Sequence, residues 1–216
     1  MDGLLFLSSV LLTLMNSKNE ALVIPRTGSS CPNNVICPSY IVIRDKSTNG
    51  YEYRRYDESK WIGTNHIAMT LTPEDELIMR RRLDTYFVGG NAERATIDRT
   101  LPVTLRVAPN SPPDGRSVFV MLRMLPPAIH HNTPAPTADS VFIQEVPPFN
   151  AFVRRFPGRL SFSKRRQKIT SLKNDIGDTS RYYQEYFLLS EFESNTAGDV
   201  NNEAWLISTE HVLQNV

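Results

Sequence analysis

Runs of apolar residues, separated by turn residues, dominate the first third of the chain. The β-rich run 40–43 is followed by Ser-Thr-Asn-Gly at 47–50 and by a second β-rich run at 51–56. Asn49-Gly50 between two such runs predicts a β-hairpin, because both positions tolerate a positive φ. The apolar and polar pattern over 61–69 predicts a further strand.

An amphipathic helix is predicted over Pro73 to Val88. Thr72 is a suitable N-cap, Pro73 suits the first helical turn, and the acids at 74–76 favour the positive end of the helix dipole. Gly89-Gly90 then ends the element as a left-handed cap. One face carries apolar residues at helical spacing, namely Met79, Leu83, Tyr86 and Phe87.

The remaining chain repeats this alternation of strands and a helix. Strands are predicted over 101–107 and 118–125, joined by the turn-rich segment 109–115. The proline-rich segment 126–136 is predicted to be a surface connection. Strands at 141–143 and 149–156, a helix from Ser163 to Gly177, and strands within 182–192 and 203–207 complete the pattern.

Two strands share an apolar-Arg-Arg-aromatic sequence, which indicates an internal duplication. Tyr53-Arg54-Arg55-Tyr56 is matched by Val153-Arg154-Arg155-Phe156. Each half would contain two strands, a helix and further strands. Neither half alone could cover the apolar face of its sheet, so the halves are expected to pack into one α+β domain.

The apolar run from Leu4 to Met15 is too short to cross a hydrocarbon layer of about 30 Å as a helix. It is typical of a signal-peptide core, with cleavage expected near Ser17 or Ala21. We therefore assign 1–21 to a signal peptide and expect a secreted, extracellular mature chain. A retained, membrane-associated N-terminus is the alternative.

The two cysteines of the chain, Cys31 and Cys37, lie close together in sequence. In an oxidising compartment such a pair is most simply a local disulfide. Free thiols and a metal site are the alternatives, although zinc would need two further ligands and no histidine lies near the pair in sequence.

Composition narrows the class of function. Twenty-four Lys and Arg against 23 Asp and Glu give a net charge of +1, which argues against a nucleic-acid partner held by phosphate contacts. The hydrophobic fraction of 40% and the charged fraction of 22% are those of a globular protein. The sequence has no phosphate-binding loop, dinucleotide fingerprint, His-Glu-x-x-His or Gly-x-Ser-x-Gly, so we predict that the protein is not an enzyme.

Several motifs in order resemble those of the SOUL/heme-binding protein family. They are 51–56 with Lys60-Trp61, 100–104, 139–143, 152–156 with Gly158, and 202–207. The family implies a distorted antiparallel β-barrel of two pseudo-symmetric halves flanked by two α-helices, in agreement with the duplication. We accordingly divide the chain into the signal peptide, an N-terminal extension over 22–38 with the disulfide, a SOUL-like domain over 39–210, and a tail over 211–216.

The resemblance also implies a non-catalytic binding protein for haem or a related tetrapyrrole. Such a ligand would bind weakly in an apolar cleft beside the first helix, because a flat macrocycle needs apolar walls and its propionates favour arginine. The residues at the matching positions are Met79, Leu83 and Phe87 for the walls and Arg80, Arg81 and Arg82 for the rim. The alternatives are that the apolar stripe is plain core and the arginines a solvated face.

No strong iron ligand is evident. Some relatives carry a histidine, proposed as the axial ligand, where this chain has Arg55, and a guanidinium does not ligate iron. His66 is the weak remaining candidate, against a structural role. His130 and His131 are expected to be solvated, with metal scavenging as the alternative. His211 is expected on a loose tail.

Another class of function is a protein-interaction module, or a carrier of another flat amphiphile that has lost haem binding. The second predicted helix carries Ile169, Leu172 and Ile176, whose spacing faintly resembles a helix by which one relative is thought to contact Bcl-2-type proteins.

Overall fold

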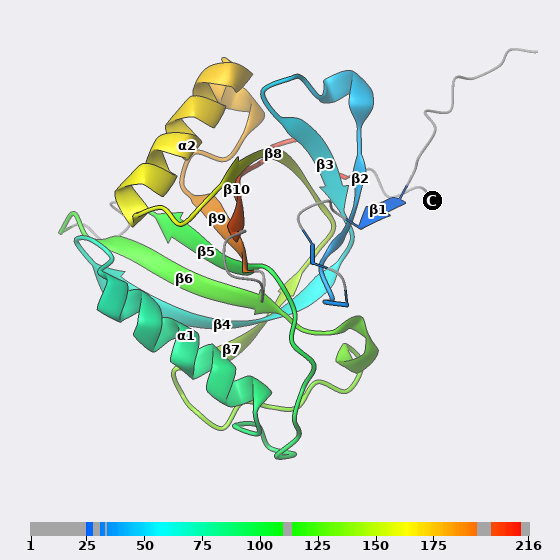
Figure 1. The fold of residues 1–216 in the computed structure, drawn as a ribbon, viewed down its shortest axis with the longest axis vertical. Coiled ribbons are helices and arrows are strands. Elements are labelled where there is room, and N and C mark those ends of the chain that lie inside the picture. The colour runs from blue at the N-terminus through cyan, green and yellow to red at the C-terminus, as the bar shows by residue number, and fades with distance from the viewer. Residues whose placement is uncertain (1–24, 28–30, 33, 110–113, 194–199, 213–216) are drawn as a thin grey trace, which may run out of the picture.

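The computed structural model describes residues 25–27, 31–32, 34–109, 114–193 and 200–212, which form one curled antiparallel sheet and two α-helices (Figure 1). The fold is thus the α+β distorted barrel that the sequence predicts. The signal peptide predicted over 1–21 lies outside the described residues. The strands are β1 (Pro25–Thr27), β2 (Ser39–Val42), β3 (Glu52–Tyr56), β4 (Ser59–Ala68), β5 (Val103–Ala108), β6 (Ser117–Met124), β7 (Val141–Val146), β8 (Phe149–Pro157), β9 (Phe187–Glu193) and β10 (Val200–Ile207). The helices are α1 (Pro73–Phe87) and α2 (Phe162–Ile176), and short 3-10 helices occupy Arg44–Lys46, Pro127–Ile129 and Thr179–Arg181.

The strand order confirms two pseudo-equivalent halves. Across the sheet the order is β1-β2-β3-β8-β10-β9-β5-β6-β4-β7. The elements of the first half, β3, β4, α1, β5 and β6, can be matched one to one with β7, β8, α2, β9 and β10 of the second. With this matching, the strand order read from β3 to β7 is the same as the order read from β7 to β3. The first strand of each half pairs with the second strand of the other, β3 with β8 and β7 with β4. The halves therefore interlock and share one core.

The two Arg-Arg strands are neighbours and not equivalent elements, which corrects the alignment inferred from the sequence. β3 pairs with β8, so that Tyr53 lies opposite Phe152 and Tyr56 opposite Phe149. In the symmetric order the counterpart of β8 is β4, and that of β3 is β7. The matched residues also lie on opposite faces of the sheet, because Tyr53 is part of the core beneath the helices whereas Val153 belongs to the buried cluster on the other face.

The bounds of the helices follow from their caps. Before α1, the Thr72 hydroxyl accepts a hydrogen bond from the Asp75 amide, and the Asp75 carboxylate accepts one from the Thr72 amide. Gly89, with φ of +107°, follows the helix as predicted. Helix α2 begins earlier than predicted, because Ser161 and not Ser163 is its N-cap. The Phe162 ring then packs on Phe119 of β6, with centroids 5.7 Å apart.

Both helices lie on the same face of the sheet and share one core with it (Figure 1). Helix α1 packs on β4 and β6, and α2 packs on β8 and β10. The side chains of α2 that enter this core are Ile169, Leu172 and Ile176. The apolar face considered above for contact with a protein partner is therefore buried within the fold.

The N-terminal extension is tied to the domain. Cys31 and Cys37 form the predicted disulfide, with their Cα atoms 6.2 Å apart. Ile36 forms a bridge with Thr100, and its carbonyl accepts a hydrogen bond of 2.9 Å from the Leu101 amide.

The segment 126–136 is only partly the surface connection predicted. Pro126 and Pro134 are buried, and the Pro134 carbonyl accepts a 2.7 Å hydrogen bond from the Tyr86 hydroxyl. This contact ties the segment to α1.

Within the described part of the chain, no helix is long and apolar enough to cross a membrane.

Candidate functional site

Two cavities border helix α1 and share one lining residue, Arg80; the two are here together called the groove. The first, here called the α1–α2 cavity, has a volume of about 550 Å³ and lies between the beginnings of the two helices. Its apolar walls are Leu71, Leu77, Leu160 and Phe162. Its charged lining residues are Glu76, Arg80, Arg159, Arg165 and Glu191.

The second, here called the α1 C-terminal cavity, has a volume of about 350 Å³. Its apolar walls are Leu83, Phe87, Val88, Ile97 and Val103. Its charged lining residues are Arg80, Asp84, Arg99 and Arg123. Both volumes are in the range of small-molecule sites, and both cavities combine apolar walls with arginines.

Arg80 borders both cavities. It projects from α1 towards β9, where its Nη2 lies 2.6 Å from Oε2 of Glu191. The side chains of Arg80 and Glu191 are 22% and 16% exposed, so the pair is partly screened by water. The predicted rim residue Arg80 thus lies at the groove, but its guanidinium already pairs with the carboxylate of Glu191.

The other two arginines of the run point elsewhere. Arg81 is exposed and lines neither cavity. Arg82 lies across β4, where its Nη1 is 3.3 Å from the Thr64 hydroxyl and 3.4 Å from the Asn65 carbonyl. The structure therefore brings only Arg80 of the three to the groove.

The three predicted wall residues are all core residues. Met79, Leu83 and Phe87 are 1%, 1% and 4% exposed. Leu83 and Phe87 also form part of the wall of the α1 C-terminal cavity, whereas Met79 lines neither cavity. The contact of these side chains with a ligand stays a prediction.

Sequence reasoning missed Arg123 of β6. It is 5% exposed, its Nε donates to the Thr100 carbonyl over 3.1 Å, and its Nη1 lies 2.7 Å from Asp84. The guanidinium also lies 4.4 Å from the centroid of the Phe87 ring. Burial lowers the pKa of Arg123, and the carboxylate of Asp84 opposes this effect. An arginine within the apolar run 118–125 was the signal that could have found it.

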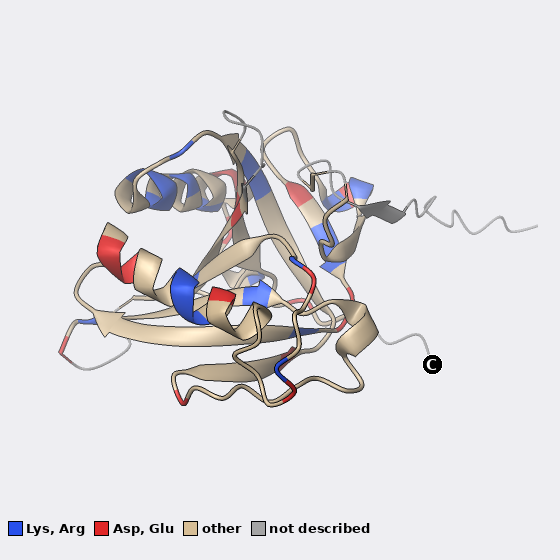
Figure 2. Ribbon diagram, turned by 60° about the horizontal axis from the view of Figure 1, so that its bottom comes forward, with Lys and Arg blue, Asp and Glu red and all other residues tan. Residues whose placement is uncertain are grey.

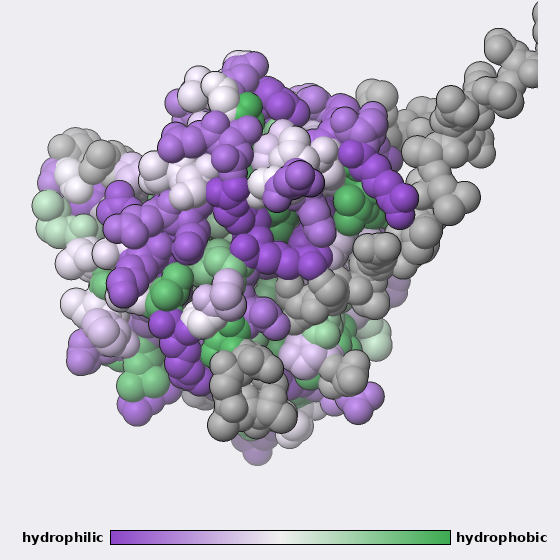
Figure 3. All heavy atoms as spheres, turned by 45° about the horizontal axis from the view of Figure 1, so that its top comes forward, coloured by the Kyte–Doolittle hydropathy of each residue, from purple (hydrophilic) through white to green (hydrophobic). Residues whose placement is uncertain are grey.

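Helix α2 brings positive charge to the α1–α2 cavity. Its first turns are rich in Lys and Arg, whereas α1 begins with acids (Figure 2). Arg165, 7% exposed, pairs with Glu76 of α1. Arg159 is exposed, and no described residue forms an ion pair with it. The surface over α2 is mainly hydrophilic (Figure 3).

The histidines are not placed as iron ligands in the groove. His66 lies 3.4 Å from Asp75, whose pKa is held below its usual value mainly by hydrogen bonds from Thr72 and to a smaller extent by His66. His130 contacts the Leu125 carbonyl at 2.9 Å, and His131 is exposed. Among the described residues, no histidine lines either cavity and no group of three or more His, Cys, Asp or Glu side chains could hold a metal ion.

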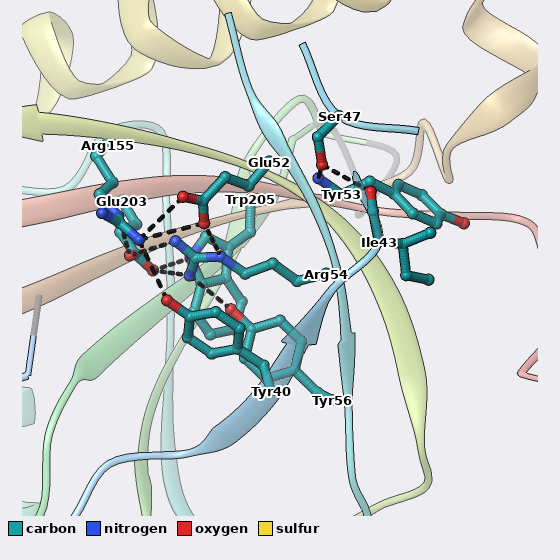
Figure 4. Close-up of polar contacts among 10 residues, drawn as sticks. All are labelled: Tyr40, Ile43, Ser47, Glu52, Tyr53, Arg54, Tyr56, Arg155, Glu203 and Trp205. Atoms are coloured by element: carbon teal, nitrogen blue, oxygen red, sulfur yellow. Dashed lines mark hydrogen bonds and ion pairs between the residues drawn. The ribbon is translucent and has the colours of Figure 1, made fainter. Parts of the chain in front are cut away.

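The opposite face of the sheet holds a buried polar cluster (Figure 4). Arg54 of β3 forms two 3.0 Å hydrogen bonds with Glu203 of β10, and both side chains are 1% exposed. Tyr56 accepts a hydrogen bond from Arg54, and the Trp205 indole donates to Glu203. The Arg54 guanidinium lies 4.0 Å from the centroid of the Tyr40 ring. These groups satisfy one another, and the cavity that Arg54, Glu203 and Trp205 line has a volume of only about 10 Å³, so we assign the cluster a structural role.

Known proteins resemble this chain in sequence and in fold. The model of the SOUL heme-binding protein family matches residues 35–207. Heme-binding protein 2 of Mus musculus is 29% identical over 167 residues, covering 76% of this chain and 80% of that protein. Heme-binding protein 2 of Homo sapiens is also 29% identical, covering 73% and 77%.

Two solved structures share the fold at low identity. A hydrolase from Listeria innocua has a TM-score of 0.51 at 9% identity, covering 77% of this chain and 95% of that one. EcmrR, in complex with DNA, has a TM-score of 0.55 at 8% identity, covering 78% and 61%. At such identities the likeness concerns the fold alone. The match of the family model over most of the chain shows that the protein belongs to the SOUL heme-binding protein family.

Proposed function

We propose that this protein binds haem or a related tetrapyrrole reversibly, without converting it chemically, in the groove beside α1. The observation that carries the proposal is the position of Arg80 between two apolar-walled cavities in a member of a heme-binding family. Apolar walls suit the macrocycle, and arginines suit its propionates. Iron bound in the groove would have no histidine ligand from the described residues.

The Arg80–Glu191 pair sets the electrostatics of the proposed site. A propionate that binds Arg80 has to replace the Glu191 carboxylate or share the guanidinium with it. Because two carboxylates close together repel each other, Glu191 is expected to weaken the binding of an anionic ligand. We therefore expect the binding to be weak and reversible.

Hemin titration of three variants tests this role. A saturable shift of the Soret band is expected for the wild-type chain. Arg80→Met should raise the Kd about tenfold by removing a charge-assisted hydrogen bond, and Glu191→Gln should lower the Kd by releasing Arg80. Arg81→Met, on the same helix but outside both cavities, is the matched control. Binding that is unsaturable, or equal in all variants, would refute the proposal.

A second pair of variants identifies the cavity. Leu77 lines the α1–α2 cavity and is 48% exposed, and Val88 lines the α1 C-terminal cavity and is 73% exposed. Both positions should accept Glu without loss of the fold. The added carboxylate should weaken hemin binding only where it borders the occupied cavity. If neither Leu77→Glu nor Val88→Glu changes the Kd, hemin binds elsewhere.

We also propose that the protein acts outside the cell. The disulfide between Cys31 and Cys37 supports this, because such bonds persist in oxidising compartments. Mass spectrometry of the protein from the culture medium of expressing cells tests it. A mature N-terminus close to residue 22 is expected. Full-length, reduced protein confined to the cytosol would contradict the proposal.

A further inference from the structure

A third cavity lies on the opposite side of the sheet from the helices. It has a volume of about 430 Å³ and is lined by strands of both halves and by residues 208–212, which follow β10. Side chains alternate between the two faces of a strand. On β5, Leu105 and Val107 enter the core beneath the helices, so Arg106 points to the other face. Its pairing partner Leu188 belongs to the cluster of buried residues on that face.

Aromatic and apolar side chains form the walls of this cavity. Leu122, Leu188 and Ile207 come from three different strands, and Phe149 comes from the beginning of β8. Tyr183 and Tyr186 lie at the edge, with their rings nearly parallel at 12° and their centroids 6.2 Å apart. Tyr183 is 37% exposed, although it is a large aromatic side chain. A flat ligand could lie against these surfaces.

The cavity has one cation that no described carboxylate neutralises. Arg106 lies with its guanidinium 5.7 Å from the centroid of the Tyr186 ring and forms no ion pair with a described residue. The acids at the rim are engaged elsewhere, Glu145 with Lys60 and Glu210 with Lys46. Burial raises the pKa of Tyr186 and Arg106 opposes the increase, so the hydroxyl stays neutral at physiological pH. The fixed charges beside the walls thus favour an anion.

The lining also contains a buried acceptor without a partner. Asn150 is 4% exposed, and its Nδ2 donates to the Glu210 carbonyl over 3.2 Å. Its Oδ1 has no hydrogen-bond partner among the described residues. A buried amide oxygen without a partner is rare in folded proteins. Asn150 precedes Phe152 by two positions on β8, so its side chain points to the helix side of the sheet, and this oxygen is sealed from a ligand beside Arg106.

We propose that this cavity is a second ligand site, for a small aromatic anion. The aromatic part lies against Tyr183 and the apolar walls, and the anionic group pairs with Arg106. The sheet separates this site from the groove beside α1, so the inference does not depend on haem binding.

The fluorescent probe 8-anilinonaphthalene-1-sulfonate has this chemistry, with two aromatic groups and a sulfonate. Titration of the full chain should give a saturable increase in fluorescence. Arg106→Met, which keeps the aliphatic stem, should raise the Kd about tenfold, and Tyr183→Ala should also raise it. Arg116→Met is the matched control, because Arg116 pairs with Asp114 and does not line the cavity.

Amide chemical shifts of the labelled chain locate the probe. The largest changes are expected at Leu188 and Ile207. Hemin affinity should be unchanged by Arg106→Met, which separates this test from that of the proposed function. Shift changes centred on α1, a Kd equal in Arg106→Met and wild type, or the absence of saturable binding would each overturn the inference.

Discussion

Arg54 and Glu203, 149 positions apart in the chain, form a two-pronged ion pair inside the protein. Arg54 lies on β3 and Glu203 on β10, the two strands that flank β8. Burial by itself would lower the pKa of Arg54, but the Tyr56 hydroxyl and the Glu203 carboxylate outweigh it and the pKa lies above its usual value. The pair therefore stays charged and joins the two halves of the domain.

Arg54→Met should strongly destabilise the protein. It leaves the buried carboxylate of Glu203 without its main partner, which typically costs about 3–5 kcal/mol. Urea denaturation measures the loss. The double variant Arg54→Met with Glu203→Leu should be more stable than Arg54→Met alone, because neither of these two buried side chains then carries a charge. Arg116→Met, at an exposed ion pair, should leave the midpoint nearly unchanged. An unchanged midpoint for Arg54→Met would contradict the structural role.

Met79→Ala should lower the free energy of unfolding by about 2–5 kcal/mol, because the side chain is fully packed in the core and its removal leaves a cavity. Leu77→Ala, two positions earlier on the exposed side of α1, should lower the free energy of unfolding much less. Thermal and urea unfolding of both variants test this. Equal losses would mean that Met79 is not buried as described.

Replacing both cysteines by serine should lower the free energy of unfolding by about 2 kcal/mol, as expected for a disulfide that closes a short loop. Alkylation of the denatured protein should label Cys31 and Cys37 only after reduction. Labelling without reduction, or stability unchanged by the double substitution, would show that the bond does not form.

The free energy of unfolding should fall above pH 10. Burial, with a smaller contribution from Glu93, raises the pKa of Tyr86 from 10.0 to about 12. Between these values the unfolded chain releases a proton that the folded protein keeps, so stability decreases as the pH rises. Below pH 10 the Tyr86 hydroxyl is protonated in both states, so its full contribution to the free energy of unfolding is present. Burial raises the pKa of Tyr40, Tyr53 and Tyr56 in the same direction.

Urea midpoints measured from pH 8 to pH 12 test the alkaline loss. Tyr86→Phe has no hydroxyl to titrate, so its stability should decline less steeply than that of the wild type. It should also be less stable at pH 8, because it lacks the hydrogen bond to the Pro134 carbonyl. The same slope in both proteins would mean that Tyr86 titrates normally.

Local signals were enough to predict the disulfide and, apart from β1 and the short 3-10 helices, the elements. Thr72, Pro73 and Gly89 define the ends of α1, because caps depend on a few neighbouring residues. Asn49-Gly50 precedes β3 of the predicted hairpin, but neither residue has the positive φ on which the prediction rested, and a 3-10 helix lengthens the connection. The order of the family motifs then specified the fold. The likeness of the two Arg-Arg strands was misleading, since sequence periodicity shows which side chains share a face and not which strands correspond.

The groove and the third cavity were decided by tertiary packing. Consecutive residues of a helix point about 100° apart, so Arg80, Arg81 and Arg82 could not all face one ligand, and only the packing of β9 and β4 shows where each points. Likewise, Arg106 and Tyr183 lie far apart in sequence and border one cavity because β5 pairs with β9, the strand that follows Tyr183. Helical and strand periodicity predicts a buried face, but whether a neighbouring element seals that face or leaves room for a ligand depends on contacts between distant segments.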